Sequence, residues 1–204
     1  MRNFPRLTIA LSVLGAGLML LPQSMQAGLY FDADALVTGE LWRLISGHLI
    51  HADFSHWAWN TLALIVLGSF LEVRSRRLFA YSLLSGVVAV DLLLLSPLAG
   101  IDQYCGLSGV LNALLGVVLF CYWLDTRSCL VVFSALLCLG KILLEMVFDT
   151  SLLTNISWPP LPAAHLAGVV GACALLVIIG GKARFPAAGR CDGGLAQIYL
   201  KNET

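Results

Sequence analysis

The sequence predicts an all-α membrane protein, a bundle of six transmembrane helices with both termini in the cytoplasm. Its composition, its apolar runs and the placement of its basic residues predict this fold. Of the 204 residues, 59% are hydrophobic and only 12% are charged, and the mean hydropathy is +0.88. A soluble domain carries about twice that share of charged residues, so the composition excludes a soluble enzyme and a disordered regulator. The net charge of +0 leaves no excess of Lys and Arg for a nucleic-acid partner.

Six apolar runs approach the length that crosses about 30 Å of hydrocarbon at about 1.5 Å per residue. We expect spans at 7–21, 56–71, 78–95, 106–124, 129–148 and 164–179. They form one domain, 1–181, followed by a short cytoplasmic tail, 182–204, that is expected to be flexible. The first run also resembles a signal peptide, but Met25 stands where the cleavage pattern needs a small residue, so a retained span is favoured. The segment 41–50 is too apolar for a solvated loop and too short to span, which indicates an interfacial or re-entrant segment.

Basic residues indicate the direction of the spans. If the chain crosses the membrane at every run, ten of the 12 Lys and Arg residues fall on one side. The charged residues of the loops on the opposite side are mostly Asp and Glu. Loops rich in Lys and Arg stay in the cytoplasm. We therefore expect both termini inside, with the second, fourth and sixth spans running from the outside to the inside.

Polar side chains inside a span are costly, so each one is a functional hypothesis. Five of them lie near the outer ends of the second, fourth and sixth runs, and so share one depth: His56, Asn60, Ser108, Asn112 and His165. A hydroxyl, imidazoles and amides at one level supply the nucleophile, the general base and the oxyanion donors of a serine-hydrolase site. Alone, a serine in a membrane helix is usually structural and bonds the carbonyl four residues earlier.

Small residues accompany both the serine and the histidine. Gly106 and Gly109 flank Ser108, and Gly168 follows His165 by three residues. Such residues let two helix backbones approach closely. We therefore expect the hydroxyl of Ser108 to lie about 2.6–3.2 Å from the imidazole of His165.

The other charged residues within the spans have structural explanations. Lys141 and Glu145 stand four residues apart, which is the spacing of an ion pair along one helix face. Asp91 has no evident partner in the sequence, and we expect either a structural hydrogen bond for it or a position near the outer interface. The three histidines within 48–56 lack the spacing of a known metal site, and no carboxylate or thiol completes one. No metal and no cofactor are expected.

Five motifs follow one another along the chain. They are Trp42-Arg43, His51-x4-His56-x3-Asn60, Gly68-x3-Glu72, Gly106-Leu107-Ser108-Gly109 and His165-x2-Gly168. In this order they resemble the rhomboid intramembrane serine proteases over the whole six-span core. Many rhomboids have a Tyr four residues after the nucleophile, where this chain has Asn112, and often a second Gly where it has Ala172.

The resemblance implies a role for each motif residue. Ser108 would be the nucleophile and His165 the general base, a dyad with no carboxylate partner. His56, Asn60 and the backbone N–H of Ser108 would form the oxyanion hole. The positions that support the site are Asn112, Gly106, Leu107 and Gly109. The structural positions are Trp42 and Arg43, which anchor the outer loop, Glu72, which ties helix ends together, and Gly168.

The amino-acid sequences of segments 30–35, 39–44 and 46–51 look most like those of the rhombosortase branch of this family. That branch implies cleavage, near the outer leaflet, of the C-terminal tail of exported proteins: a Gly-Gly-type motif, one hydrophobic helix and a basic end. The partners would be this transmembrane substrate and the lipid bilayer. The location would be the bacterial inner membrane, with the active site facing the periplasm. The alternative is a catalytically silent rhomboid-like protein that binds transmembrane segments.

Overall fold

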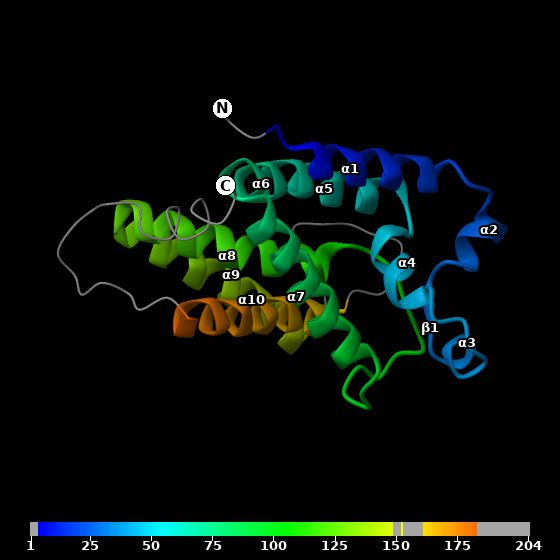
Figure 1. Ribbon diagram of the computed structural model, residues 1–204. Coiled ribbons are helices and arrows are strands. Elements are labelled where there is room, and N and C mark those ends of the chain that lie inside the picture. Colours follow the sequence, from blue (N-terminus) through cyan, green and yellow to red (C-terminus); the bar gives the residue numbers. More distant parts are fainter. Residues whose placement is uncertain (1–3, 149–151, 153–160, 183–204) are drawn as a thin grey trace.

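The chain folds into a bundle of long helices with short elements at one end. The computed structural model describes residues 4–148, 152 and 161–182. Its elements are α1 (Arg6–Met19), α2 (Gln23–Ala27), β1 (Phe31–Asp32), α3 (Ala33–Val37), α4 (Arg43–Leu49), α5 (Phe54–Ala63), the π-helix η1 (Leu64–Gly68), α6 (Ser69–Arg74), α7 (Arg76–Leu94), β2 (Gln103–Tyr104), α8 (Ser108–Thr126), α9 (Cys129–Phe148) and α10 (Pro162–Lys182). Figure 1 shows the long helices side by side, with α2, α3, α4 and β1 gathered at one end.

Within the described residues, five helices are long and apolar enough to cross a membrane. They are Phe54–Arg74, Arg76–Leu94, Ser108–Thr126, Cys129–Phe148 and Pro162–Gly180. The first of these combines α5, η1 and α6. The first expected span, 7–21, is present as α1, but this helix has 14 residues. At about 1.5 Å per residue it covers about 21 Å, less than the hydrocarbon thickness of about 30 Å. The expected tail, 182–204, lies outside the described residues from position 183 onward.

Local signals set where the spans begin. Asp53 caps α5, with its Oδ1 accepting the backbone N–H of His56 at 2.8 Å, and Ser75 caps α7 in the same way. Both helices therefore start two residues earlier than expected. The fourth span starts at Ser108 rather than at the expected Gly106, because Gly106 has a φ of 117° that a right-handed helix cannot include.

Small residues bring α7, α8 and α10 into close contact. A Cβ atom added at Gly168 of α10 would lie 1.9 Å from the carbonyl oxygen of Gly109 in α8. One added at Gly86 of α7 would lie 2.9 Å from the Cβ of Ala113. The backbones approach each other across these positions in the manner of small-residue membrane contacts. Around these contacts lies a buried apolar core, which includes Leu71, Phe79, Val110, Leu114, Val117 and Ala172.

The outward faces of the long helices are apolar. Leu84 of α7, Phe133 of α9 and Val177 of α10 are all exposed, and they belong to a large set of exposed apolar side chains. A soluble monomer rarely exposes a continuous apolar surface of this kind. This surface fits a lipid environment.

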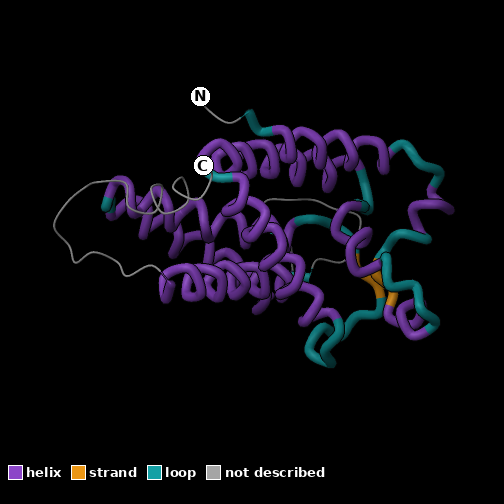
Figure 2. Tube along the Cα trace, viewed as in Figure 1, coloured by secondary structure: helices purple, strands orange, loops and turns teal. Residues whose placement is uncertain are grey.

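The segments before α4 and before α8 are joined by backbone pairing. β1 and β2 form an antiparallel ladder in which Phe31 pairs with Tyr104, drawn in orange in Figure 2. The N–H of Gly106 donates to the carbonyl of Gly47 in α4 at 2.9 Å. The sequence pattern does not predict this ladder, because each strand has only two residues. The ladder fixes the position of the loop that leads into Ser108.

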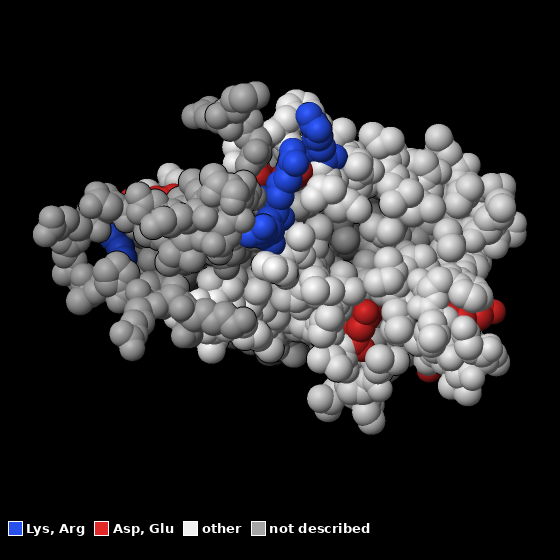
Figure 3. All heavy atoms as spheres, viewed as in Figure 1, with Lys and Arg blue, Asp and Glu red and all other residues white. Residues whose placement is uncertain are grey.

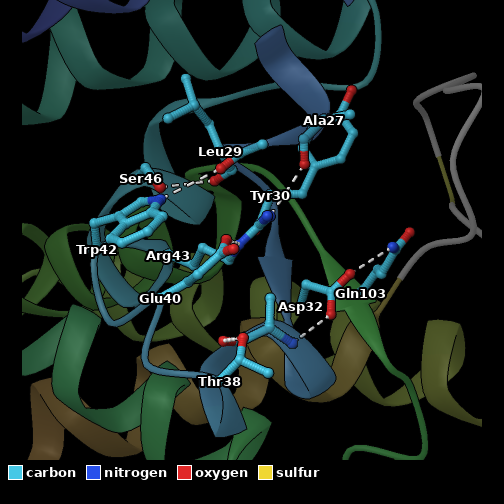
Figure 4. A network of polar contacts seen from close by, with 12 residues as sticks. Ala27, Leu29, Tyr30, Asp32, Thr38, Glu40, Trp42, Arg43, Ser46 and Gln103 are labelled. Carbon is cyan, nitrogen blue, oxygen red and sulfur yellow. Dashed lines mark hydrogen bonds and ion pairs between the residues drawn. The ribbon is translucent and has the colours of Figure 1, made fainter. Parts of the chain in front are cut away.

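A polar network holds the segment around α4, as Figure 4 shows. The guanidinium of Arg43 is buried and donates to the carbonyls of Ala27 at 3.0 Å and Tyr30 at 2.8 Å, and to the carboxylate of Glu40 at 2.6 Å. Trp42 Nε1 donates to a backbone carbonyl at a longer 3.4 Å. The segment 41–50 thus contains a short helix, α4, fastened to the chain that precedes it.

Glu72 fastens the start of α1 to α6. Its carboxylate is fully buried and accepts the backbone N–H of Leu7 at 2.9 Å and of Thr8 at 2.8 Å, as well as the hydroxyl of Thr8 at 2.9 Å. The first N–H groups of a helix have no partner within the helix, and a negative charge near a helix N-terminus is favourable. Glu72 therefore supplies acceptors for two of these N–H groups and a negative charge at the N-terminus of α1.

We expect Glu72→Gln to lower the free energy of unfolding by about 1–3 kcal/mol, because the amide turns an N–H group toward buried donors. Thermal unfolding of the purified protein in detergent measures the effect. Ser12→Ala is the matched control, since the hydroxyl of Ser12 only bonds the Thr8 carbonyl within α1. Equal unfolding temperatures for the two variants would contradict the anchoring role of Glu72.

Candidate active site

Ser108 and His165 meet where α8 and α10 begin. Ser108 is the first residue of α8, and His165 lies in the first turn of α10. The Oγ of Ser108 and the Nε2 of His165 are 3.0 Å apart, which is a hydrogen-bond distance. The close approach of Gly109 and Gly168 brings the two helices together immediately below this pair. The pair has the geometry that a serine nucleophile and its base require.

Gly106 shapes the entry to α8. A Cβ atom at this position would lie 2.5 Å from Cε1 and 2.6 Å from Nε2 of His56, so a larger residue would displace the His56 ring. Its positive φ is a second reason for glycine. Leu107 then packs as a buried residue before Ser108. Because Ser108 is the first helical residue, its backbone N–H has no acceptor within α8 and is available to an oxyanion.

His56 and Asn60 lie one turn apart on α5 and line the same cavity as Ser108 and His165. Both side chains are buried, with 8% and 6% of their surface exposed. Among the described residues, His56 Nδ1 and Asn60 Nδ2 have no hydrogen-bond partner. A buried donor without a partner is costly. These two groups are therefore poised to meet a polar atom that enters the cavity.

His51 packs edge-on against His56, with ring centroids 5.0 Å apart. Burial, together with the nearby His56, lowers the pKa of His51 to about 3, so this ring is neutral at ordinary pH. The neutral ring supports the imidazole of His56 without adding a positive charge to the site. His51 thus belongs to the packing behind the cavity.

The cavity has a volume of about 830 Å³, within the range of ligand-binding sites. Asn112 lines it, and its Nδ2 donates to the carbonyl of Ser108 at 2.9 Å. That amide therefore bonds its own helix at the place where many rhomboids carry a tyrosine. Cys105 also lines the cavity, but burial raises the pKa of its thiol to about 12. A thiol that stays protonated is a poor nucleophile.

Two polar contacts in this region were not predicted from the sequence. His165 was expected to have no carboxylate partner, but its Nδ1 lies 3.5 Å from Oε2 of Glu145. The expected ion pair of Glu145 with Lys141 is present at 2.5 Å. A helical spacing of four predicted that pair, whereas the packing of α9 against α10, which brings Glu145 to His165, has no local sequence signal.

The second contact that was not predicted involves Asp91, whose partner is His48. The Nε2 of His48 and Oδ1 of Asp91 are 3.0 Å apart, which joins α4 to α7. Tyr104 packs edge-on against the His48 ring, with centroids 5.9 Å apart. Burial raises the pKa of Tyr104, so its hydroxyl stays protonated. The hydrogen bond that was expected for Asp91 is formed by a histidine 43 residues earlier.

The remaining predicted residues lie elsewhere. Trp42, Arg43 and Glu72 are absent from the cavity lining and make the structural contacts described above. Gly168 acts through close helix packing. In the part of the chain that the structure describes, no three His, Cys, Asp or Glu side chains are grouped so that they could hold a metal ion.

Membrane-length helices around a partly buried serine–histidine pair define a multi-pass membrane protein with a hydrolase-like site. The family model of the Rhomboid domain matches residues 38–182, which is more than half of the chain. The protein belongs to the rhomboid family, whose members are generally intramembrane serine proteases, although some are inactive. The chain matches none of the curated proteins with which it was compared. The matched region contains the five long helices and begins after α1.

Proposed function

We propose that the protein is an intramembrane serine endopeptidase in which Ser108 is the nucleophile and His165 the general base. The observation that carries this proposal is the 3.0 Å contact between Ser108 Oγ and His165 Nε2 inside a cavity of a rhomboid-family protein. A catalytically silent member that binds transmembrane segments would not need this contact. The presence of both groups, in hydrogen-bond geometry, favours the enzyme.

The reaction follows from the two side chains. Ser108 Oγ attacks the carbonyl carbon of the scissile bond and its proton passes to His165 Nε2, so that a C–O bond forms and the carbonyl oxygen becomes an oxyanion. The C–N bond then breaks, and the imidazolium gives its proton to the leaving nitrogen. A water molecule attacks the acyl-enzyme and gives a proton to His165. When the ester C–O bond then breaks, His165 returns this proton to the Oγ of Ser108.

The oxyanion is stabilised by donors that are already in place. We assign this role to His56, to Asn60 Nδ2 and to the backbone N–H of Ser108. The unpartnered, buried Nδ2 of Asn60 and the position of Ser108 at a helix start support the assignment. Fixed donors in a site without water stabilise developing charge strongly.

The substrate we propose is the C-terminal Gly-Gly-type tail of an exported protein, held by one hydrophobic helix. A helical peptide bond is shielded, so the helix has to unwind before it is cut, and glycines lower the cost of unwinding. This assignment rests on the resemblance of segments 30–51 to the rhombosortase branch.

The orientation we propose places the active site on the periplasmic side of the bacterial inner membrane, with α1 as a sixth membrane helix and both termini in the cytoplasm. Figure 3 is consistent with it: a group of Lys and Arg lies where α1 begins, and Asp and Glu appear toward α3 and β1, while other charged atoms of both signs lie at the opposite end of the bundle. The bonds from the first turn of α1 to Glu72 keep α1 beside the other spans. Basic segments remain in the cytoplasm, so the acidic end, which carries Ser108, faces outward.

We expect a serine-directed fluorophosphonate to form a covalent adduct at Ser108, because an activated serine reacts where ordinary hydroxyls do not. Intact-mass measurement of the purified protein detects the adduct, and peptide mapping locates it. The Ser108→Ala variant should remain unlabelled. The matched control is Ser134→Ala, which removes an exposed hydroxyl on α9 and should leave labelling unchanged. A folded protein that forms no adduct would contradict the proposal and favour the silent binder of transmembrane segments.

A further inference from the structure

We propose that Glu145 is a positioning residue that orients His165, so that the site operates as a Ser108–His165–Glu145 triad. The inference rests on the proposed function and extends it, since the resemblance implies a dyad alone. It begins from the carboxylate on α9, which lies on the far side of the imidazole from Ser108. His165 Nε2 faces Ser108 at 3.0 Å, and His165 Nδ1 faces Glu145 Oε2 at 3.5 Å.

The two oxygens of Glu145 have different surroundings. Oε1 accepts from Lys141 Nζ at 2.5 Å and from the backbone N–H of Leu152 at 2.8 Å. Oε2 is buried and has no hydrogen-bond partner among the described residues, with the His165 ring as its ion-pair neighbour. The side chain is 1% exposed. Oε1 is therefore held in place by two hydrogen bonds, while Oε2 faces the imidazole of His165.

The contrast with Glu72 separates this arrangement from an ordinary structural carboxylate. Glu72 is equally buried, but both of its oxygens accept hydrogen bonds from the first turn of α1. A carboxylate that served only to neutralise Lys141 would not need an oxygen against His165. The placement of Oε2 is what the positioning role requires.

The chemistry follows from the two nitrogens of one ring. A carboxylate beside Nδ1 favours the tautomer that carries its proton on Nδ1, and this tautomer presents the Nε2 lone pair to Ser108. When Nε2 takes the serine proton, the negative charge of Glu145 stabilises the imidazolium. Glu145 accepts no proton in this step. Catalytic hydrogen bonds are often long before substrate binds and then shorten, which is consistent with 3.5 Å.

The charges around His165 determine how the site responds to pH. The described titratable groups near its ring are Glu145 and Lys141 from α9 and His56 from α5, and the neutral hydroxyl of Ser108 from α8 is its hydrogen-bond partner. Glu145 is the anion among them, and Lys141 and any protonated His56 oppose the imidazolium. Removal of the Glu145 charge therefore makes protonation of His165 harder.

The test compares fluorophosphonate labelling rates of the full chain in detergent across pH. We expect Glu145→Gln to lower the rate by about 100-fold; loss of the corresponding carboxylate in soluble serine proteases costs up to about 10⁴-fold. We also expect the acid limb of the pH–rate profile to move to lower pH. Glu72→Gln is the matched control: it should lower the unfolding temperature and leave the acid limb in place.

Two results would overturn the positioning role. One is a wild-type rate in Glu145→Gln, and the other is a reduced rate with an unmoved acid limb, as a purely structural role predicts. If Glu145→Gln does not fold, Glu145→Asp decides. A reduced rate with the acid limb moved to lower pH supports the role, because the shorter chain draws the carboxylate away from Nδ1, and a wild-type rate or an unmoved acid limb rejects it. Ser108→Ala tests the proposed function separately. Labelling that persists there refutes Ser108 as the nucleophile and the triad with it, whereas loss of labelling there together with a wild-type rate in Glu145→Gln refutes the role of Glu145 alone.

Discussion

Ser108→Ala and His165→Ala are each expected to abolish peptide cleavage, with a fall in kcat on the order of 10⁶-fold, as for the members of a soluble serine-protease site. The double variant should lose no more than either single variant. The physical reason is that the hydroxyl and the imidazole act as one unit: without the base the serine keeps its proton, and without the serine the base has nothing to activate. Their 3.0 Å contact makes this dependence direct.

The measurement uses the full chain reconstituted with a tailed transmembrane substrate, followed by mass analysis of the released product. Ser134→Ala again serves as the control, because it changes a hydroxyl outside the cavity lining. Additive losses in the double variant would show that the two residues act independently and would contradict the mechanism.

The second large effect is expected from Gly168→Ala. The new methyl carbon would lie 1.9 Å from the Gly109 carbonyl oxygen and 3.1 Å from the backbone nitrogen of Ala113, and no side chain is there to give way. α8 and α10 have to separate, which moves Ser108 away from His165. We expect a loss of stability at the upper end of the usual overpacking range of about 1–3 kcal/mol, together with loss of fluorophosphonate labelling.

Gly140→Ala is the matched control for this prediction. Gly140 lies within α9, and a Cβ atom there meets nothing within 4 Å. Alanine is the better helix former by about 1 kcal/mol, so this variant should be as stable as the wild type or slightly more stable. Thermal unfolding and labelling of both variants, side by side, make the comparison. Equal behaviour of the two alanine variants would show that the contact of α8 with α10 does not position the site.

Much of this arrangement could be predicted from composition and spacing. Apolar runs indicated the five long helices, because hydrocarbon tolerates little else over that length. A shared depth on three helices predicted that His56, Ser108 and His165 lie close together, and all three line one cavity. Small residues near Ser108 and His165 indicated that the backbones of α8 and α10 approach closely, and they do so at Gly109 and Gly168.

Other features depend on contacts between distant segments and have no local pattern. The carboxylate of Glu145 reaches His165 only because α9 packs against α10, and Asp91 meets His48 only because α4 packs against α7.

The pairing of β1 with β2, and of Gly106 with Gly47, has a mechanical consequence. The segment that contains β1 and α4 and the loop that leads to Ser108 are joined by these backbone hydrogen bonds, and the side chain of Gln103 adds a further bond to Asp32 at 2.8 Å. A displacement of α4 must either break these bonds or carry the start of α8 with it. A movement of α4 is therefore transmitted through backbone hydrogen bonds to the position of Ser108 Oγ.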